Sequence, residues 1–413
     1  MMLPRRVAAG LSVIAISGAA GITSPQVDAR YPAQSGTASG KVTPAQLKTS
    51  VERLGSFDFP VRMEAGRTVR RAEPSIAVPA LLETVSNAGA DWYVRFRALV
   101  LLSGFNDPRT RETMVKMLQE RNDRLRAVGY AWFEHHRDPA VLPQLFAAID
   151  RETSEFVRPA LTRALAACAS DPVPRVGSLA TTVRDTMTRL VMSGQDLFRA
   201  VVIEALGEYR AAYALPAIID VARLDGPLQD DAILAIGRIG DKRGLVALAE
   251  LQRTAPRTLQ PSIAAAICLL GSNCDSHSGY LQETLGFAIA NPGHQELLRS
   301  AAGGLAALAV AGSKEAAAIL FERGAPTRDP ERAAIALAIG TLALRNTPLL
   351  LQTLESRTDM QAATELLREA FDMLEEDFEE ERFFVSVRRA YWAAPTGSPA
   401  RKVAETLIQR LEF

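Results

Sequence analysis

The chain has 413 residues, with 47 basic and 47 acidic side chains, 48% hydrophobic residues and only 6% aromatic residues. A disordered chain and a polytopic membrane protein are excluded, because charged residues are spread through the sequence and no second long apolar run is present. The net charge of zero also argues against a protein that binds nucleic acid through its phosphates, since such domains carry a basic excess.

Residues 1–29 have the pattern of a secretory signal peptide. Arg5 and Arg6 follow the start, residues 7–20 are apolar or small, and residues 27–29 (Val-Asp-Ala) offer a small-x-small cleavage site. The apolar stretch is too short to be a permanent membrane span. We therefore expect an exported protein, periplasmic or extracellular, with no integral membrane span after cleavage. The alternative is an uncleaved N-terminal anchor.

The folded part is expected to begin near residue 44. Residues 30–43 have the composition of a flexible linker, rich in Pro, Ala, Gln, Ser, Gly and Thr. Thr43 followed by Pro44 is a good capping and first-turn pair, so a first helix is predicted to run to Leu54.

One phrase recurs between about residues 59 and 355. It consists of an arginine, small and aliphatic residues, a position usually filled by Gly or Ala, a polar turn with Asp and often Pro, and a second aliphatic helix. Eight equivalent positions span 237 residues in seven intervals, a mean period of about 34. A hairpin of two short helices cannot bury both its apolar faces alone, so it needs a neighbour on either side. The sequence therefore predicts an all-α solenoid. The eight positions are Ser103, Trp132, Ala169, Gly207, Gly237, Gly271, Ala306 and Gly340.

Glycine and Asp-Pro pairs predict where the helices of each hairpin end and begin. The glycines at 207, 237, 271 and 340 are expected at helix C-termini, where a left-handed residue is favoured. The Asp-Pro pairs are expected to cap and start the next helix.

The phrase R-x-x-A-x-x-x-L-G with a following Asp resembles the short bacterial HEAT-like repeats of the type first described in phycobilin-lyase-related proteins. The resemblance covers roughly residues 60–355 and implies a superhelix of helical hairpins. It also implies a functional concave face lined by the second helix of each hairpin. The family includes scaffolds, lyases, hydroxylases and binding proteins, so the resemblance does not define an activity.

Residues 44–356 are assigned to the solenoid and residues 357–413 to a helical C-terminal cap. Helices are expected over residues 358–376 and 378–392, and a last helix from Ser398-Pro399 to Leu411. The acidic run at residues 375–381 is interpreted as a solvated face of the cap. Alternatively, it binds a basic partner.

Seven arginines recur at the heads of first helices. We expect each to reach the turn aspartate of an adjacent repeat, such as Asp107, Asp138 or Asp241, because a planar bidentate donor suits such a tie. The alternative is a basic ladder that binds carboxylates or phosphates. The arginines are Arg95, Arg97, Arg124, Arg126, Arg163, Arg199 and Arg332.

The segment around Gly271 contains the closest grouping of reactive side chains in the sequence. Cys268 and Cys274 form a disulfide, or both are free thiols, or they bind zinc together with His277 and His294. Cys168, alone on an Ala-rich helix, is predicted to be a buried small hydrophobe.

The sequence predicts no catalytic residue and no cofactor. The remaining histidines, His135 and His136, follow Glu134 without recurrence, whereas HEAT-like hydroxylases need His-Glu pairs that recur across repeats. A bilin lyase is expected in a pigment-bearing compartment and not behind an export signal. No phosphate-binding Gly loop or exposed-Ser elbow is present.

The prediction is therefore an exported, monomeric scaffold that binds a protein or peptide on its concave face without catalysis. The alternative is a HEAT-like enzyme, or a small-ligand or metal-binding protein, with a pocket in the concavity. The mixed charges expected on the concave second helices are Glu112, Lys116, Asp150, Asp220, Arg223, Glu250 and Arg253.

Overall fold

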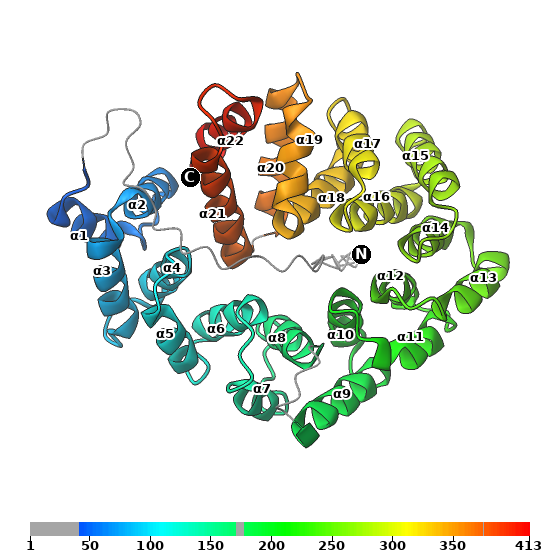
Figure 1. Cartoon of the computed structure of the whole chain (residues 1–413), viewed down its shortest axis with the longest axis horizontal. Helices are drawn as coiled ribbons and strands as arrows, with labels where there is room; N and C mark the ends of the chain where they lie inside the picture. The colour runs from blue at the N-terminus through cyan, green and yellow to red at the C-terminus, as the bar shows by residue number, and fades with distance from the viewer. Residues whose placement is uncertain (1–40, 171–176, 375) are drawn as a thin grey trace, which may run out of the picture.

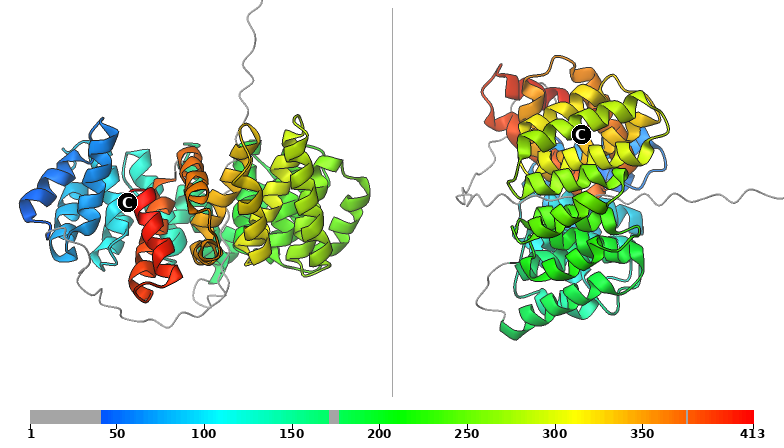
Figure 2. Two further views of the ribbon diagram at one scale, coloured as in Figure 1. Left: turned by 90° about the horizontal axis from the view of Figure 1, so that it is seen from above. Right: turned by 90° about the vertical axis from the view of Figure 1, so that its right-hand side faces the viewer.

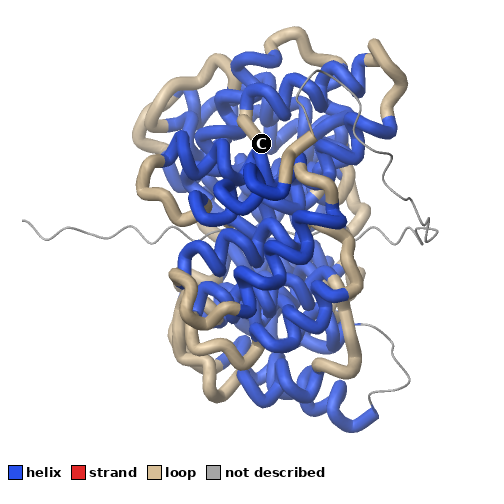
Figure 3. Tube along the Cα trace, turned by 90° about the vertical axis from the view of Figure 1, so that its left-hand side faces the viewer, coloured by secondary structure: helices blue, strands red, loops and turns tan. Residues whose placement is uncertain are grey.

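The structure is a computed structural model that describes residues 41–170, 177–374 and 376–413. Within these ranges the chain forms α-helices, two short 3-10 turns (Ala212–Ala214 and Arg257–Leu259) and no strand (Figure 3). The predicted all-α fold class is confirmed. The predicted signal peptide, residues 1–29, lies outside the described residues, as does the predicted linker up to residue 40.

The hairpins stack side by side, with one helix of each facing the centre of the molecule and the other facing outward (Figure 1). The inner layer is α4 (Trp92–Ser103), α6 (Asp123–His135), α8 (Arg158–Ser170), α10 (Asp196–Glu208), α12 (Gln229–Ile239), α14 (Gln260–Leu269), α16 (Gln295–Val310) and α18 (Glu331–Arg345). The outer layer is α5 (Arg109–Met117), α7 (Leu142–Ala148), α9 (Gly177–Met192), α11 (Leu215–Ala222), α13 (Gly244–Thr254), α15 (Cys274–Ala290), α17 (Lys314–Gly324) and α19 (Thr347–Glu355).

The two ends of the solenoid meet, so the described chain forms a closed ring (Figures 1 and 2). The first helices are α1 (Pro44–Arg53), α2 (Phe59–Arg71) and α3 (Pro74–Ser86), and the last are α20 (Met360–Leu374), α21 (Asp377–Ala393) and α22 (Pro399–Arg410). Helix α21 packs against α4 as well as against α18 and α19. The predicted superhelix is thus present, but it returns to its own start.

The predicted helix boundaries at both ends are confirmed within a few residues. Helix α1 begins at Pro44 with a full capping box, in which the Thr43 hydroxyl accepts from the Gln46 backbone N–H and the Gln46 side chain accepts from the Thr43 N–H. Helix α22 begins at Pro399, and the hydroxyl of Ser398 accepts from the Arg401 N–H. These signals are local in sequence, which is why the sequence predicted them.

The role predicted for the recurrent glycines is wrong at three of four positions. Gly271 has a φ of +76° just after α14, as expected of a helix C-terminus. Gly207, Gly237 and Gly340 lie inside α10, α12 and α18. A Cβ on Gly237 would lie 2.6 Å from the Cα of Ala266 on the next inner helix. The missing side chain therefore lets inner helices approach closely.

The partners predicted for the recurrent arginines are also wrong. The arginines do bind groups of the chain itself, but these groups are not the turn aspartates. Arg95 donates to the Val85 carbonyl near the end of α3 (3.0 Å) and to Glu120, just after α5 of its own hairpin (2.6 Å). Arg332 donates to the Gly324 carbonyl at the end of α17 (3.3 Å) and to Glu369 of α20 (2.7 Å). A cation is favoured at a helix C-terminus, where carbonyls are unpaired.

The turn aspartates bind arginines of the outer layer instead. They lie at the opposite end of the hairpin from the head arginines, beside the first turn of the second helix. Their partners are Arg109 for Asp107, Arg111 for Asp138 and Arg243 for Asp241.

Candidate functional site

A pocket of about 340 Å³ opens at the centre of the ring, where α6, α8, α10 and the start of α21 converge. The inner face of each helix supplies the lining, so the pocket depends on closure of the ring by α21. At this volume it lies near the lower end of the range for ligand sites, large enough for one or two side chains or a small molecule.

The wall of the pocket is apolar and aromatic. Phe156, in the loop before α8, and Leu197, in the first turn of α10, are about half exposed at the rim. The Arg124 guanidinium lies 3.7 Å from the Phe156 ring centroid, and the Arg158 guanidinium lies 3.6 Å from that of Phe198. These cation–π contacts fix the aromatic rings in place.

The polar end of the pocket carries two carboxyls from neighbouring inner helices, Glu204 of α10 and Asp231 of α12. The Oε1 atom of Glu204 is buried without a hydrogen-bond partner. Burial raises the pKa of Glu204 well above its usual range, against the opposing charge of Arg238. Burial, with the neighbouring Asp230, raises the pKa of Asp231 to about 7. Both carboxyls are therefore held partly or wholly neutral near pH 7.

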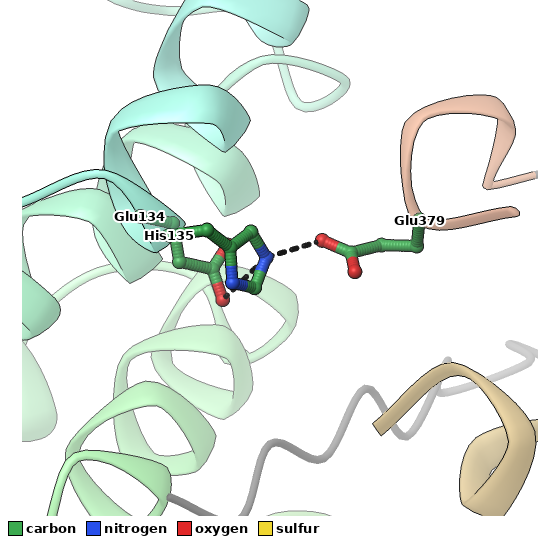
Figure 4. A group of neighbouring side chains, drawn as sticks. All are labelled: Glu134, His135 and Glu379. Carbon is green, nitrogen blue, oxygen red and sulfur yellow. Dashed lines mark hydrogen bonds and ion pairs between the residues drawn. The ribbon is translucent and has the colours of Figure 1, made fainter. Parts of the chain in front are cut away.

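Beside the pocket lies a buried polar network in which Glu134, His135 and Glu379 meet (Figure 4). The Nε2 atom of His135 lies 2.7 Å from Oε1 of Glu379 and 4.0 Å from Oε1 of Glu134. The Tyr209 hydroxyl donates to Glu134 at 2.8 Å. Residues 244 positions apart in sequence thus meet at the ring closure.

The trio of Glu134, His135 and Glu379 has the ligand types of a metal site, but its surroundings do not fit a cation. Arg163 lies 3.3 Å from Glu134, and Arg345 lies 3.6 Å from Glu134 and 3.8 Å from Glu379. Arg382 also contacts Glu379. Three guanidiniums already balance two carboxylates, so a metal ion would be repelled.

These charges also determine the protonation of the network. Burial alone would raise the pKa of Glu379, but Arg382, His135 and Arg345 hold that pKa well below its usual range. The same balance lowers the pKa of Glu134. Glu208 has no hydrogen-bond partner for either oxygen, and burial raises its pKa to about 8. The network therefore contains two ionised carboxylates and one neutral carboxyl.

The acidic run of the cap is not a solvated face, and the structure shows why. Glu379 and Glu381 are 3% and 1% exposed. Arg70 of α2 donates to Glu381 at 2.6 and 2.8 Å, and Arg97 of α4 pairs with Asp377. The acidic run therefore binds basic residues of the chain's own first hairpins.

The predicted partner-binding residues do not lie on the concave face. The second helices form the outer layer, so the expectation that they line the concavity is wrong. Whether they bind a partner stays a prediction. The structure pairs Lys116 with Glu112 (3.0 Å) and Arg223 with Glu250 (2.8 Å) on this outer surface. Of the seven residues, Glu112, Lys116, Asp150, Asp220, Arg223 and Arg253 are exposed and Glu250 is half-buried.

The sequence did not mark the residues of the pocket as a site, although it drew attention for other reasons to two of its arginines, Arg124 and Arg163, and to the acidic run at residues 375–381. Glu204 and Asp231 lie on largely apolar helices that also carry other acids, and no local motif distinguishes them from those neighbours. A usable signal was present in the glycines of the first helices. Glycines let helices approach closely, and the helices that approach most closely lie on the inside of a curved stack. This reasoning would have placed the first helices of the hairpins, and the acids on them, at the centre.

Of the three alternatives for the cysteines around Gly271, the structure has the disulfide. Cys268, at the end of α14, and Cys274, at the start of α15, form a disulfide with a Cα–Cα distance of 4.4 Å. His294 contacts the ring of Phe287, and neither His277 nor His294 joins a candidate metal group in the described part of the chain. Cys168 is buried in the core, as predicted.

In the described ranges, no single helix is long and apolar enough to cross a membrane. Helices α18 and α19 meet the criteria of length and composition only as a pair, and they are bent by 115° relative to each other.

The fold defines the class of the described chain as an α-solenoid of HEAT-like helical hairpins, here closed into a ring. No protein-family model matches the chain, and no curated protein matches it. Among solved structures, it is similar to YibA of Escherichia coli, with 18% identity and a TM-score of 0.32 over 58% of this chain and 99% of YibA.

Two larger solenoids are also similar. Kap121p, solved bound to Nup53p, has 13% identity and a TM-score of 0.43 over 89% of this chain and 49% of that chain. Importin beta has 12% identity and a TM-score of 0.40 over 89% of this chain and 62% of that chain. This chain thus spans about half the length of the Kap121p chain and under two thirds of the importin beta chain. These likenesses decide neither activity nor partner, and the finer resemblance to phycobilin-lyase-related repeats rests on the sequence phrase alone.

Proposed function

We propose that this chain is an exported binding scaffold without catalysis of its own, and that it holds a segment of a partner polypeptide in the central pocket. The observation that carries the proposal is the pocket itself. Its walls come from α6, α8, α10 and α21, which the ring fixes relative to one another. A preformed concave site needs little ordering when it binds, which favours affinity.

The rim of the pocket suits a polypeptide. Leu197 and Phe156 expose apolar surface beside the opening, where flanking residues of an extended segment would pack. Isolated exposed apolar residues are common, but these two border a concavity with apolar walls. The outer helices instead present paired charges, which contribute little to affinity at an exposed surface.

Site-specific photo-cross-linking tests the proposal. A photoreactive amino acid replaces Leu197 at the pocket rim, or Val246 on outer helix α13 as the matched control. Both are aliphatic and more than half exposed, at 56% and 67%. We expect the Leu197 position alone to capture one reproducible partner segment, and a synthetic peptide of that segment to compete. Capture only from Val246 would overturn the proposal and favour the outer-helix residues.

A second candidate function is binding of a free small molecule. The size of the pocket and its two carboxyls with raised pKa values favour it, because such groups cluster at functional sites. Native mass spectrometry of the purified chain tests it. A copurifying molecule that Leu197→Asp displaces, with no polypeptide captured, would replace the scaffold proposal.

The export proposal rests on residues 1–29 of the sequence. Mass spectrometry of the mature N-terminus is expected to find a chain that begins near residue 30. A membrane-bound chain that begins at Met1 would show that the segment is kept as an anchor.

A further inference from the structure

We propose that the central pocket recognises a positively charged side chain, lysine or arginine, on the bound polypeptide, through the carboxyls of Glu204 and Asp231. This inference rests on the proposed function and specifies the chemistry of the segment. The apolar wall would contact the aliphatic stem of that side chain, and the two carboxyls would receive its ammonium or guanidinium group.

The first support is the charge balance of the lining. Six carboxyls and three guanidiniums line the pocket. Arg163 pairs with Glu134, Asp377 pairs with Arg97, and Glu379 pairs with Arg345 and Arg382. Four carboxyls of the lining then remain against the two guanidiniums that lie over aromatic rings, Arg124 and Arg158, so the lining has more acids than bases. The six carboxyls are Glu155, Glu204, Asp231, Glu376, Asp377 and Glu379.

The second support is that Glu204, at the polar end of the pocket, has a carboxyl oxygen without a hydrogen-bond donor. This oxygen is the buried Oε1. The charges that act on Glu204 are Arg238 and Arg163, opposed by Glu208 and Asp231. Asp231 is likewise influenced by Arg238 and opposed by Asp230. Four acids of α10 and α12 thus surround the single guanidinium of Arg238. A buried carboxyl without a donor is costly, and a bound cation would supply both hydrogen bonds and charge.

The shape of the site separates this ligand from two others. The carboxyls at the polar end would repel an anion. Arg238, the guanidinium beside them, does not line the pocket and so does not offer an anion a partner there. A metal ion needs more ligands than Glu204 and Asp231 provide, and these two join no candidate metal group in the described chain. Aromatic and aliphatic walls around an acidic end fit a cation carried on an apolar stem.

The proposal has a defined pH dependence. The ionised forms of Glu204 and Asp231 attract the cation, while both are partly protonated in the free protein near pH 7. Binding therefore releases protons, and affinity should rise between about pH 6 and pH 8. A lysine side chain stays charged throughout this range.

Calorimetric titration of the full chain tests the inference with three probes. These are the capped tripeptide leucine–lysine–leucine, the same tripeptide with norleucine in place of lysine, and hexylamine. We expect the lysine peptide to bind about tenfold or more tighter than the norleucine peptide at pH 8. This advantage should shrink at pH 6 and disappear in the double variant Glu204→Gln, Asp231→Asn. The control Asp220→Asn, on outer helix α11, should leave it unchanged.

The outcomes separate the two proposals. Equal binding of the lysine and norleucine peptides, or an advantage that survives in the double variant, would overturn the cation inference. The scaffold proposal would then stand or fall on the cross-linking result. Tight binding of hexylamine without the peptide advantage would favour the small-molecule function. The double variant replaces carboxyls that are already partly protonated with neutral amides of similar size. It should therefore fold, and circular dichroism checks this.

Discussion

At the scale of single residues, the centre of the ring stabilises some carboxyls as anions and others as neutral acids. Glu379 and Glu134 are ionised because guanidiniums surround them, whereas Glu208 is kept neutral by burial without a donor. The difference arises from hydrogen-bond partners and not from depth, since all three are buried.

Glu208→Gln should change how stability depends on pH. With a pKa of about 8 in the folded state and an ordinary value in the unfolded state, the folded chain retains a proton that the unfolded chain loses. The contribution to stability is therefore complete below about pH 4.5 and is lost as pH rises through 8. Relative to the natural chain, the variant should gain on the order of 4 kcal/mol in unfolding free energy between pH 5 and pH 9, at about 1.4 kcal/mol for each unit between pH 5 and the folded-state pKa.

Urea unfolding of both chains at pH 5, 7 and 9 measures this difference. Glu112→Gln, on the exposed face of α5, is the control and should show little change with pH. A stability difference for Glu208→Gln that does not vary with pH would contradict the neutral state of Glu208.

Gly237→Ala should destabilise the chain because the new Cβ would lie 2.6 Å from the Cα of Ala266. The neighbouring helix cannot give way there without moving its backbone, and overpacking of this kind costs about 1–3 kcal/mol. Gly279→Ala, inside α15 with no atom within 4 Å of the new Cβ, should instead stabilise by about 0.5–1 kcal/mol. Thermal melts of the two variants should shift in opposite directions. Equal shifts would show that the inner seam is not close-packed.

At the scale of elements, the joint between α14 and α15 is covalent. The Cys268–Cys274 disulfide closes a short loop, with a separation of six residues. Because loop entropy grows with loop length, we expect Cys268→Ser with Cys274→Ser to lose about 2 kcal/mol.

Thiol titration gives an independent measure of this bond. The unfolded, unreduced chain should show one reactive thiol, that of Cys168, and three after reduction. Three thiols before reduction would mean that the two cysteines are not bonded.

At the scale of the whole molecule, the ring is closed by ion pairs between its ends. Arg70 and Glu381 are 9% and 1% exposed, and Glu381 also contacts Arg388 at 3.4 Å. Arg70→Ala leaves the Glu381 carboxylate buried with a weaker partner, which should cost on the order of 3 kcal/mol. Small-angle scattering should show a larger radius of gyration as the ends separate.

The control for Arg70→Ala is Arg111→Ala. Arg111 pairs with Asp138 between neighbouring outer elements, and its side chain is 52% exposed, so its loss should cost less than about 1 kcal/mol and leave the ring closed. If both variants kept the natural radius of gyration and melting temperature, the buried pair would not be what holds the ring closed.

The sequence by itself determined the helical hairpins, their period and the ends of the first and last helices. These features depend on residues a few positions apart, such as Thr43 with Gln46 or Ser398 with Arg401, and such contacts form in any fold that contains the helix. Only the tertiary structure decided the closure of the ring, the partners of the acidic run and the central pocket. Arg70 and Glu381 are 311 residues apart, and Glu204 and Asp231 face one pocket from different helices. Such long-range contacts depend on the rotation of each hairpin relative to the one before it. These small rotations accumulate along a solenoid, so no local sequence pattern can encode them.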